Sequence, residues 1–358
     1  MSVNLATKYS SQIAQKHTAG SYLANKAKAP YDFVGVKTIS IPNLISQALS
    51  SYSRTGTSSR YGTMAELQDA RQEISITQDK SFNIAIDKGN NEEQMMIKEA
   101  GRVMQMQIRE QLIPTSDQYV LAKWAAGAGK TLAYSDAISK SLVIGMLLDV
   151  EVHMANNNTP EDERYVCVKN THMKYIRLSD EFAYVDGARD RMILKGQVGK
   201  VGTLNIIAMP DSWFPTKVEH VAFNSRAVGF PFKIRDTRII TDSEDVNGVK
   251  LLGRFNYDGF VVGPICDDVV VCVASGYKCA TPTATKGSTT TALASSTNSG
   301  TVNIKYTVDG TDPRWSTTAV TYSEAITNPT AGVVIKAVAE YVSSGYYYQS
   351  DVLTHTCV

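Results

Sequence analysis

The sequence predicts an α+β chain that is followed by a separate all-β module. A single long amphipathic helix is expected over residues 91–113. Strand patterns recur between residues 203 and 262, with a hairpin signal at Asn247-Gly248. The composition then changes after Ser275: of the 83 residues 276–358, 26 are serine or threonine and 10 are charged. A chain of 358 residues suits about two domains with well-buried cores.

The first 31 residues are basic and contain no acidic side chain. Large apolar side chains are few in this segment, so it cannot form a core of its own. The composition predicts an extended basic arm, and a solvated tail fits it equally well. The basic residues of this arm are Lys8, Lys16, Lys26 and Lys28.

A long loop is predicted between two strand regions. Residues 34–41 alternate as a strand that Pro42 closes, and residues 43–70 show no sustained periodicity. Residues 74–86 are then expected to form a hairpin, with a two-residue turn at Asp79-Lys80. A loop of this length inside a compact domain is usually functional or disordered. We therefore expect a long excursion that is anchored by strands.

The helix over 91–113 is expected to begin at the cap residue Asn91 and to stop at Pro114. A second helix is expected to begin at Ser116 and Asp117 and to end at Gly127. Its last residues run into "AAGAGKT" (125–131), which looks like a phosphate-binding loop. That loop needs a glycine where this chain has Trp124, and it must follow a strand. The sequence therefore predicts a helix end and a turn, and not a nucleotide site.

The middle of the chain alternates helix and strand patterns. A helix is expected near 135–155, a buried strand within 159–169 and a helix over 170–178 that Asn170 caps, which together make an α/β unit. Strands follow at 203–209, 218–224 and 232–241. Within the C-terminal module, residues 302–308, 318–326 and 332–342 alternate well enough to predict a small antiparallel β-sandwich.

Enzyme and metal signatures are absent from the sequence. There is no HExxH or GxSxG motif, and the five histidines are scattered, so we expect them on the surface or hydrogen-bonded in the core. The five cysteines form no CxxC pair and are expected to be mostly buried thiols, although pairing of Cys279 with Cys357 stays open. Asp309 and Asp312 suit a turn better than a calcium site. No catalytic residue, cofactor or metal is predicted, so the chain is not expected to be an enzyme.

Charge and hydropathy exclude other classes of protein. A formal net charge of +1 argues against a whole-chain nucleic-acid binder, because such proteins concentrate lysine and arginine. The longest apolar stretch is interrupted by Pro264, Asp267 and Asp268 and is too short to span a bilayer. The first residues lack the apolar core of a signal peptide, so the chain is expected to stay in a cytoplasm.

The order of these segments resembles a major capsid protein of tailed phages, with the Hong Kong ninety-seven phage coat fold. Three segments are also similar in sequence to the family, namely "TPEDERYVCVKNTHMKYI", "GQVGKVGTLNIIAMPDSW" and "FNYDGFVV". The resemblance covers residues 1 to about 275. It implies an N-terminal arm (1–32), an E-loop with a strand-anchored base (33–88), the spine helix with the first part of a peripheral domain (89–134), an axial domain (135–230), the return strands of the peripheral domain (231–275) and an appended immunoglobulin-like domain (276–358).

The last domain has a resemblance of its own. "IKYTVDGTDPRWSTTAVTYSEAI" (304–326) is similar to the immunoglobulin-like modules at the C-termini of chitobiases and hexosaminidases. Its aromatic residues Trp315 and Tyr346 are candidates for stacking on a surface sugar, and packing within the module is the alternative use. We expect the module to be appended to the coat fold and displayed on the outside of the shell.

The coat resemblance implies a structural protein that assembles with itself into hexamers and pentamers of an icosahedral shell. Implied partners are portal and scaffolding proteins, packaged double-stranded DNA and host-surface glycans, with no membrane. The expected location is the virion, after assembly in the host bacterial cytoplasm. The candidate inter-subunit residues of the E-loop are Arg54, Arg60, Tyr61 and Arg71. The alternative function is a secreted or surface carbohydrate-binding or adhesive protein, which the C-terminal module favours.

Overall fold

The structure is a computed structural model that describes residues 20–31, 33, 36–44, 49–55, 59–62, 64, 69–93, 99–134, 138–178, 199–241, 246–296, 302–327, 330–343 and 346–357. Its helices are α1 (Lys88–Glu93), α2 (Ala100–Gln107), the π-helical turn η1 (Ile108–Leu112), α3 (Ile113–Ala126), α4 (Lys140–Asn156), α5 (Asn170–Leu178) and the 3-10 turns η3 (Asp211–Trp213), η4 (Gly263–Asp268) and η5 (Ser275–Tyr277). Its strands up to Ala274 are β1 (Thr38–Leu44), β2 (Asp69–Ser75), β3 (Gln78–Asp87), β4 (Lys130–Tyr134), β5 (Arg164–Lys169), β6 (Lys200–Val201), β7 (Leu204–Met209), β8 (Val218–Asn224), β9 (Val228–Gly229), β10 (Phe232–Ile240), β11 (Gly248–Tyr257), β12 (Phe260–Val261) and β13 (Val269–Ala274).

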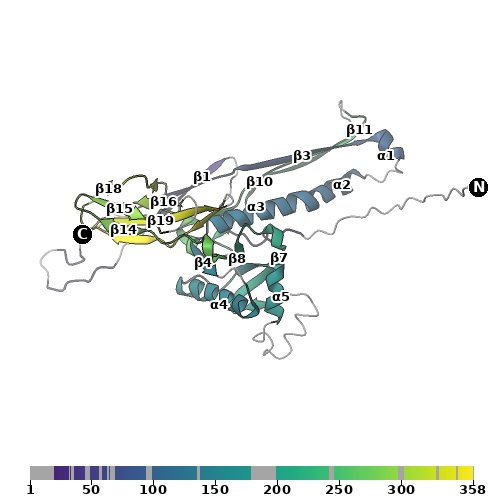
Figure 1. Cartoon of the computed structure of the whole chain (residues 1–358). Helices are drawn as coiled ribbons and strands as arrows, with labels where there is room; N and C mark the ends of the chain where they lie inside the picture. Colours follow the sequence, from purple (N-terminus) through teal and green to yellow (C-terminus); the bar gives the residue numbers. More distant parts are fainter. Residues whose placement is uncertain are drawn as a thin grey trace, which may run out of the picture.

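A mixed six-stranded sheet forms the centre of the molecule, in the order β4-β13-β8-β5-β7-β6. Side chains alternate between its faces, so β5, β7, β8 and β13 each contribute to two cores. Helix α3 covers one face, where Val120, Leu121 and Trp124 pack on Phe223 and Val271. Helices α4 and α5 cover the other face and are drawn below the sheet (Figure 1).

Strand β13 lies inside this sheet, between β4 and β8. The sequence predicts 231–275 as return strands and 89–134 with the spine helix, whereas β13 and β4 from these two ranges lie in the central sheet. The reason is visible in "VVVCVA" (269–274), whose residues are all buried. A continuous apolar run of this kind is typical of a strand that is covered on both faces.

A long arm extends from the centre and is made of the sheet β10-β11-β3 with helix α2 beside it (Figure 1). The predicted pairing of β10 with β11 is confirmed, although Gly248 already lies in β11, so Asn247-Gly248 is not a two-residue turn between them. Gly248 lies opposite Asp87, and a Cβ atom on it would meet the Ile86 carbonyl oxygen at 2.1 Å. Glycine is therefore required for this close pairing of β11 with β3.

Helices α2 and α3 run on through Pro114, so the prediction that the helix stops there is wrong. The flanking residues Ile108 and Leu112 have right-handed helical dihedral angles, and the Ile113 N–H donates to the Ile108 carbonyl oxygen, five residues back. This π-helical turn puts Pro114 at the start of a new α-helical stretch, where its missing N–H is tolerated. Gly127 ends the helix as predicted, and its N–H donates to the Lys123 carbonyl oxygen.

Strands β1 and β2 form a separate two-stranded ribbon, with Thr38 opposite Ser75 and Leu44 opposite Asp69. We call residues 38–75 the ribbon. The predicted hairpin across Asp79-Lys80 is wrong, because β3 pairs with β11 and not with β2. Asp79 instead accepts hydrogen bonds from Arg254 of β11, at 2.6 and 3.1 Å. A partner about 175 positions away cannot be found from a local turn signal.

The C-terminal module (276–358) contains two antiparallel sheets. Its strands are β14 (Thr283–Lys286), β15 (Thr290–Ala294), β16 (Val302–Thr307), β17 (Val320–Thr321), β18 (Ile326–Thr327), β19 (Val334–Ser343), β20 (Tyr346–Gln349) and β21 (Leu353–Thr356). One sheet has the order β14-β15-β18, and in the other β16 and β19 are central. Leu293 and Ile326 of the first sheet share a core with Ile304 and Ala337 of the second. The module therefore has its own core, as predicted.

Candidate assembly surfaces

Among the large apolar side chains of the described chain, those with the highest exposed fraction lie in the loop of the ribbon. Leu49 is fully exposed, Tyr61 is 85% exposed and Met64 is 96% exposed. Single exposed apolar residues are common, but several in one loop favour an interaction surface. Tyr52 packs edge-on against Tyr61 with ring centroids 5.0 Å apart, and the Ser53 N–H donates to the Arg60 carbonyl oxygen. These contacts join residues 52–53 to residues 60–61 and leave both tyrosine side chains exposed.

The structure places all four candidate residues of the ribbon at the surface. Arg54, Arg60 and Tyr61 lie in the loop, whereas Arg71 lies in β2, 3.6 Å from Asp69. The Arg71 side chain is 66% exposed, so this ion pair contributes little to stability. The surface is therefore basic as well as aromatic, which suits a contact with acidic and aromatic groups.

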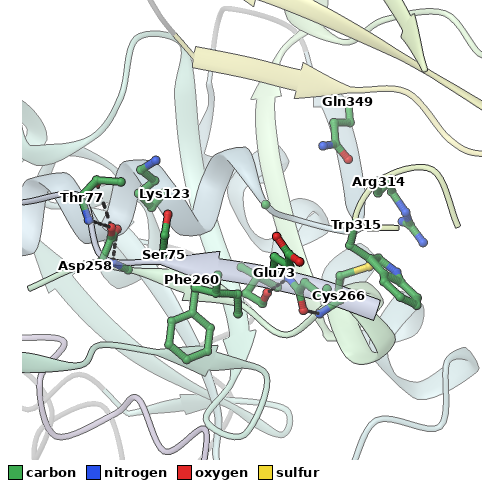
Figure 2. Close-up of a pocket in the computed structure, with 16 residues that line it drawn as sticks. Glu73, Ser75, Thr77, Lys123, Asp258, Phe260, Cys266, Arg314, Trp315 and Gln349 are labelled. Carbon is green, nitrogen blue, oxygen red and sulfur yellow. Dashed lines mark hydrogen bonds between the residues drawn. The ribbon is translucent and has the colours of Figure 1, made fainter. Parts of the chain in front are cut away.

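The base of the ribbon rests on the body. Ile41, Ile74 and Ile76 share a small core with Phe33 and Phe260. Beside this core lies a cavity of about 280 Å³, which Figure 2 shows between β2 and the C-terminal module.

The N-terminal segment 20–31 is held against the body, so it is not a solvated tail there. Leu23 is buried in the core under α3, and Asp117 accepts hydrogen bonds from the Ser21 hydroxyl (2.7 Å) and the Tyr22 N–H (2.8 Å). Burial raises the pKa of Asp117 above its usual value, against the effect of these hydrogen bonds. The sequence predicts Asp117 only as a helix start, because its hydrogen-bond partners lie about 95 residues away along the chain.

The lysines of the predicted basic arm fall into two groups. Lys26 lies over the ring of Tyr165 in β5, 4.8 Å from its centroid, and Lys28 pairs with Glu163, the residue before β5. Both lysines therefore contact the central sheet or the residue that leads into it. Lys8 and Lys16 lie outside the described residues. The role in an extended basic arm stays a prediction for Lys8 and Lys16.

The glycine run "AAGAGKT" joins a helix to a strand, the reverse of the order that a phosphate loop needs. A Cβ atom on Gly129 would lie 2.5 Å from the Asp267 backbone nitrogen, so glycine allows two loops to approach closely. Thr131 is buried, and the Lys130 ammonium donates to Asp351 of the C-terminal module at 2.6 Å. The residues that imitate a nucleotide site therefore serve as contacts within the chain.

Trp315 of the module packs on the body, where a Cβ atom on Gly263 would meet its Cγ at 2.4 Å. In the structure, the candidate sugar contact Trp315 therefore packs within the chain. Tyr346 lies in β20, and its side chain is outside the description. The "DGTDP" segment forms the predicted turn, with Asp309 accepting from the Thr311 N–H at 2.9 Å.

Two histidines meet beneath α5, although the sequence gives no sign of it. The rings of His172 and His220 are 5.0 Å apart, and within the described part of the chain neither ring nitrogen of His220 has a hydrogen-bond partner. The expectation of a satisfied core histidine is therefore wrong for His220. Burial, followed by the charges of His172 and Lys169, holds the pKa of His220 well below its usual value. His172 of α5 and Lys169 of β5 lie close to His220 of β8 only because the fold brings these three elements together.

Within the same described residues, the structure contains no group of three or more acidic, histidine or cysteine side chains arranged to hold a metal. The prediction of buried thiols is confirmed, since all five cysteines are buried and no two of them form a disulfide bond. No described helix is long and apolar enough to cross a membrane.

Solved phage structures share this fold. A chain from Mycobacterium phage Che8 matches with a TM-score of 0.64 and 16% identity, over 75% of this chain and 97% of that one. The capsid structure of the cyanophage P-SCSP1u gives 0.63 and 16%, over 76% and 93%. The mature capsid of bacteriophage PhiM1 gives 0.58 and 10%, over 76% and 92%. No family model and no curated protein matches the chain. The chain therefore has the fold of phage capsid proteins, and the similarity extends to the fold alone.

Proposed function

We propose that this chain is a major capsid protein that assembles with itself into the icosahedral head shell of a tailed phage. The observation that carries the proposal is the match to phage capsid chains over nearly their whole length. On this reading the ribbon is the E-loop, α2 to α3 is the spine helix, the β10-β11-β3 arm is the peripheral domain and the six-stranded sheet is the axial domain. The work of such a protein is interface formation, and it requires no catalysis.

The exposed ribbon loop supports self-assembly. A two-stranded ribbon is marginal by itself, and its apolar and basic loop residues lose solvent contact only when another surface covers them. We propose that this surface belongs to a neighbouring copy of the chain. A standard interface buries about 1,600 Å², and a projecting loop lets one subunit add to that area by touching several neighbours.

The C-terminal module supports a second part of the proposal. About a quarter of the chain lies outside each capsid match, which is the size of residues 276–358. We propose that the module is an immunoglobulin-like domain on the outside of the shell, where it does not compete with packaged DNA for volume. Host-surface glycans would be weak ligands that gain affinity from repetition. Portal and scaffolding proteins, and assembly in the host bacterial cytoplasm before release in the virion, belong to the same proposal.

Electron microscopy of the purified chain, alone or with a scaffold, tests this function. We expect closed shells or rings, with the module as protrusions on the outer surface. A strictly monomeric product that binds saccharides would instead favour the adhesive protein. The described structure gives that alternative little support, because Trp315, its main candidate sugar contact, packs on the body.

A further inference from the structure

The C-terminal module is attached to the body by more than the chain connection at Ser275. Tyr348 is buried in the core under α3, and its hydroxyl donates to the Thr216 carbonyl oxygen. Arg314 is 9% exposed and donates to Asp267 of η4 at 2.7 Å, while Asp312 holds its other nitrogen atoms. Asp351 accepts from Lys130 at 2.6 Å and from Lys278 at 3.0 Å. An appended domain on a flexible linker would make none of these contacts.

A second set of contacts reaches from the module to the ribbon. Trp315 lies against Gly263, which has no side chain to keep the indole away. The Gly263 N–H donates to the Gln72 Oε1 atom at 2.7 Å, and Gln72 Nε2 donates to the Val261 carbonyl oxygen at 2.9 Å. The Thr317 N–H donates directly to the Arg71 carbonyl oxygen at 3.2 Å. Arg71 and Gln72 are neighbours in β2, so the module contacts the ribbon both directly and through Gly263.

A pocket that is open to solvent lies at the joint between these parts. The cavity of about 280 Å³ is lined by β2 residues on one side and by Arg314, Trp315 and Gln349 on the other (Figure 2). Gln349 is 8% exposed, and its Oε1 atom has no hydrogen-bond partner among the described residues. Close packing fixes the position of an element, whereas an open pocket leaves room for it to shift. The ribbon base is therefore held by its small apolar core and by these directed contacts.

We infer that the module is a clamp that holds the base of the ribbon in one orientation on the body. Its own position is fixed by Tyr348, Arg314 and Asp351, and it passes this restraint to β2 through Trp315 and Thr317. Under the proposed capsid function, on which this consequence rests, the clamp would set the direction in which the ribbon reaches a neighbour. The module would then be a part of assembly and not only a decoration.

Hydrogen exchange on unassembled full-length protein tests the clamp. Trp315→Ala removes the indole that presses on Gly263, and amides of 69–75 should then exchange about tenfold faster or more, with those of β5 unchanged. Val320→Ala is the matched control, because Val320 lies in the same module with 53% of its side chain exposed. Gly263→Ala changes the other partner of this contact, because its methyl group forces the indole away, and it should also speed exchange at 69–75.

The result that overturns the clamp is unchanged exchange at 69–75 in both variants while strands 302–307 and 334–343 stay protected. If Trp315→Ala unfolds the module, the milder Trp315→Leu keeps an apolar side chain and should give a smaller increase at 69–75; no increase there would overturn the clamp as well. Because exchange is measured on single subunits, its outcome does not depend on whether shells form. Failure to assemble would count against the capsid function alone.

Discussion

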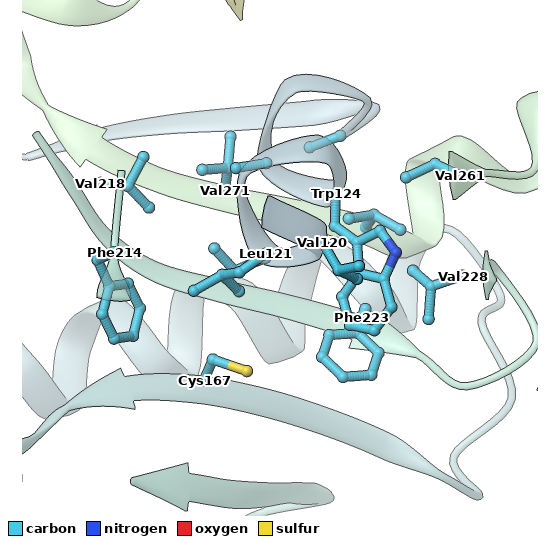
Figure 3. Close-up of a cluster of buried hydrophobic side chains, with 14 of the residues drawn as sticks. Val120, Leu121, Trp124, Cys167, Phe214, Val218, Phe223, Val228, Val261 and Val271 are labelled. Carbon is cyan, nitrogen blue, oxygen red and sulfur yellow. The ribbon is translucent and has the colours of Figure 1, made fainter. Parts of the chain in front are cut away.

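The central sheet and the ribbon are both built from β-strands, but they are stabilised in different ways. The sheet is covered on both faces by helices, and Trp124, Phe223 and Val271 lie in a core closed to solvent (Figure 3). The ribbon has two strands, a small core at its base and a loop whose largest apolar side chains are exposed. The sheet is thus covered within one chain, whereas under the proposed function the loop of the ribbon is covered by a neighbouring copy.

The largest expected effect is a loss of stability in the sheet. Trp124 is fully buried, packs on Phe223 with ring centroids 4.8 Å apart and donates to the Gly229 carbonyl oxygen at 3.2 Å. Trp124→Ala should lower the free energy of unfolding by about 3–5 kcal/mol, since it opens a cavity and leaves an acceptor unpaired. Urea unfolding of the single subunit measures this. A loss below about 1 kcal/mol would contradict the account of a closed core.

Acid should weaken the sheet through His220. Its pKa in the folded chain lies below its value in the unfolded chain, which is about 6.5, so the unfolded chain binds protons more readily. Stability is therefore unaffected above about pH 6.5 and falls below it, by up to about 1.4 kcal/mol per pH unit. His220→Leu should flatten this dependence between pH 6.5 and 5.5, and His220→Gln, which does not titrate, should do the same. Unfolding curves parallel to those of the wild type would show that His220 is not the cause.

The sequence predicted elements with strong local patterns, such as β8, α4 and the pairing of β10 with β11. It failed where a distant partner decides the structure. Asp79 and Lys80 look like a turn, yet β3 continues through them because β11 lies alongside. Asp117 looks like a helix cap and holds the N-terminal segment, and Lys130 looks like a nucleotide ligand and holds Asp351. The candidate residues in the loop of the ribbon came from the resemblance to the coat family together with the lack of periodicity in 43–70, whereas the packing of Trp315 needed the fold.

Removing the Lys130 side chain should weaken the attachment of the C-terminal module only slightly, with a smaller loss of stability than the two changes in the sheet. The Lys130 and Asp351 side chains are 26% and 39% exposed, and Lys278 still pairs with Asp351 after the change. Lys130→Ala should therefore lower stability by less than about 1 kcal/mol. A nucleotide-hydrolysis assay on wild type and variant should show no activity to lose. Hydrolysis in the wild type that the substitution abolishes would restore the nucleotide site that we reject.

The last prediction is that no covalent bond joins the subunits. Some coat proteins of the resembled family join subunits by lysine–asparagine isopeptide bonds from the E-loop, but here no lysine occurs between Lys37 and Lys80. The arginines Arg54, Arg60 and Arg71 stay protonated and are poor nucleophiles, so the ribbon should hold neighbours by hydrogen bonds. Boiled shells should run as monomers in denaturing gels. A ladder that survives reductant would show that another residue forms a covalent link.

The central claim is that the exposed loop of the ribbon is the surface that binds a neighbouring copy. Its most direct test is electron microscopy and sedimentation of a variant in which Leu49, Tyr61 and Met64 are all changed to serine, with Val320→Ser as the control. These side chains are exposed in the single subunit, so the triple variant should unfold at the same urea concentration as the wild type but remain unassembled. The control should form shells. Shells of normal size and yield from the triple variant would contradict the account.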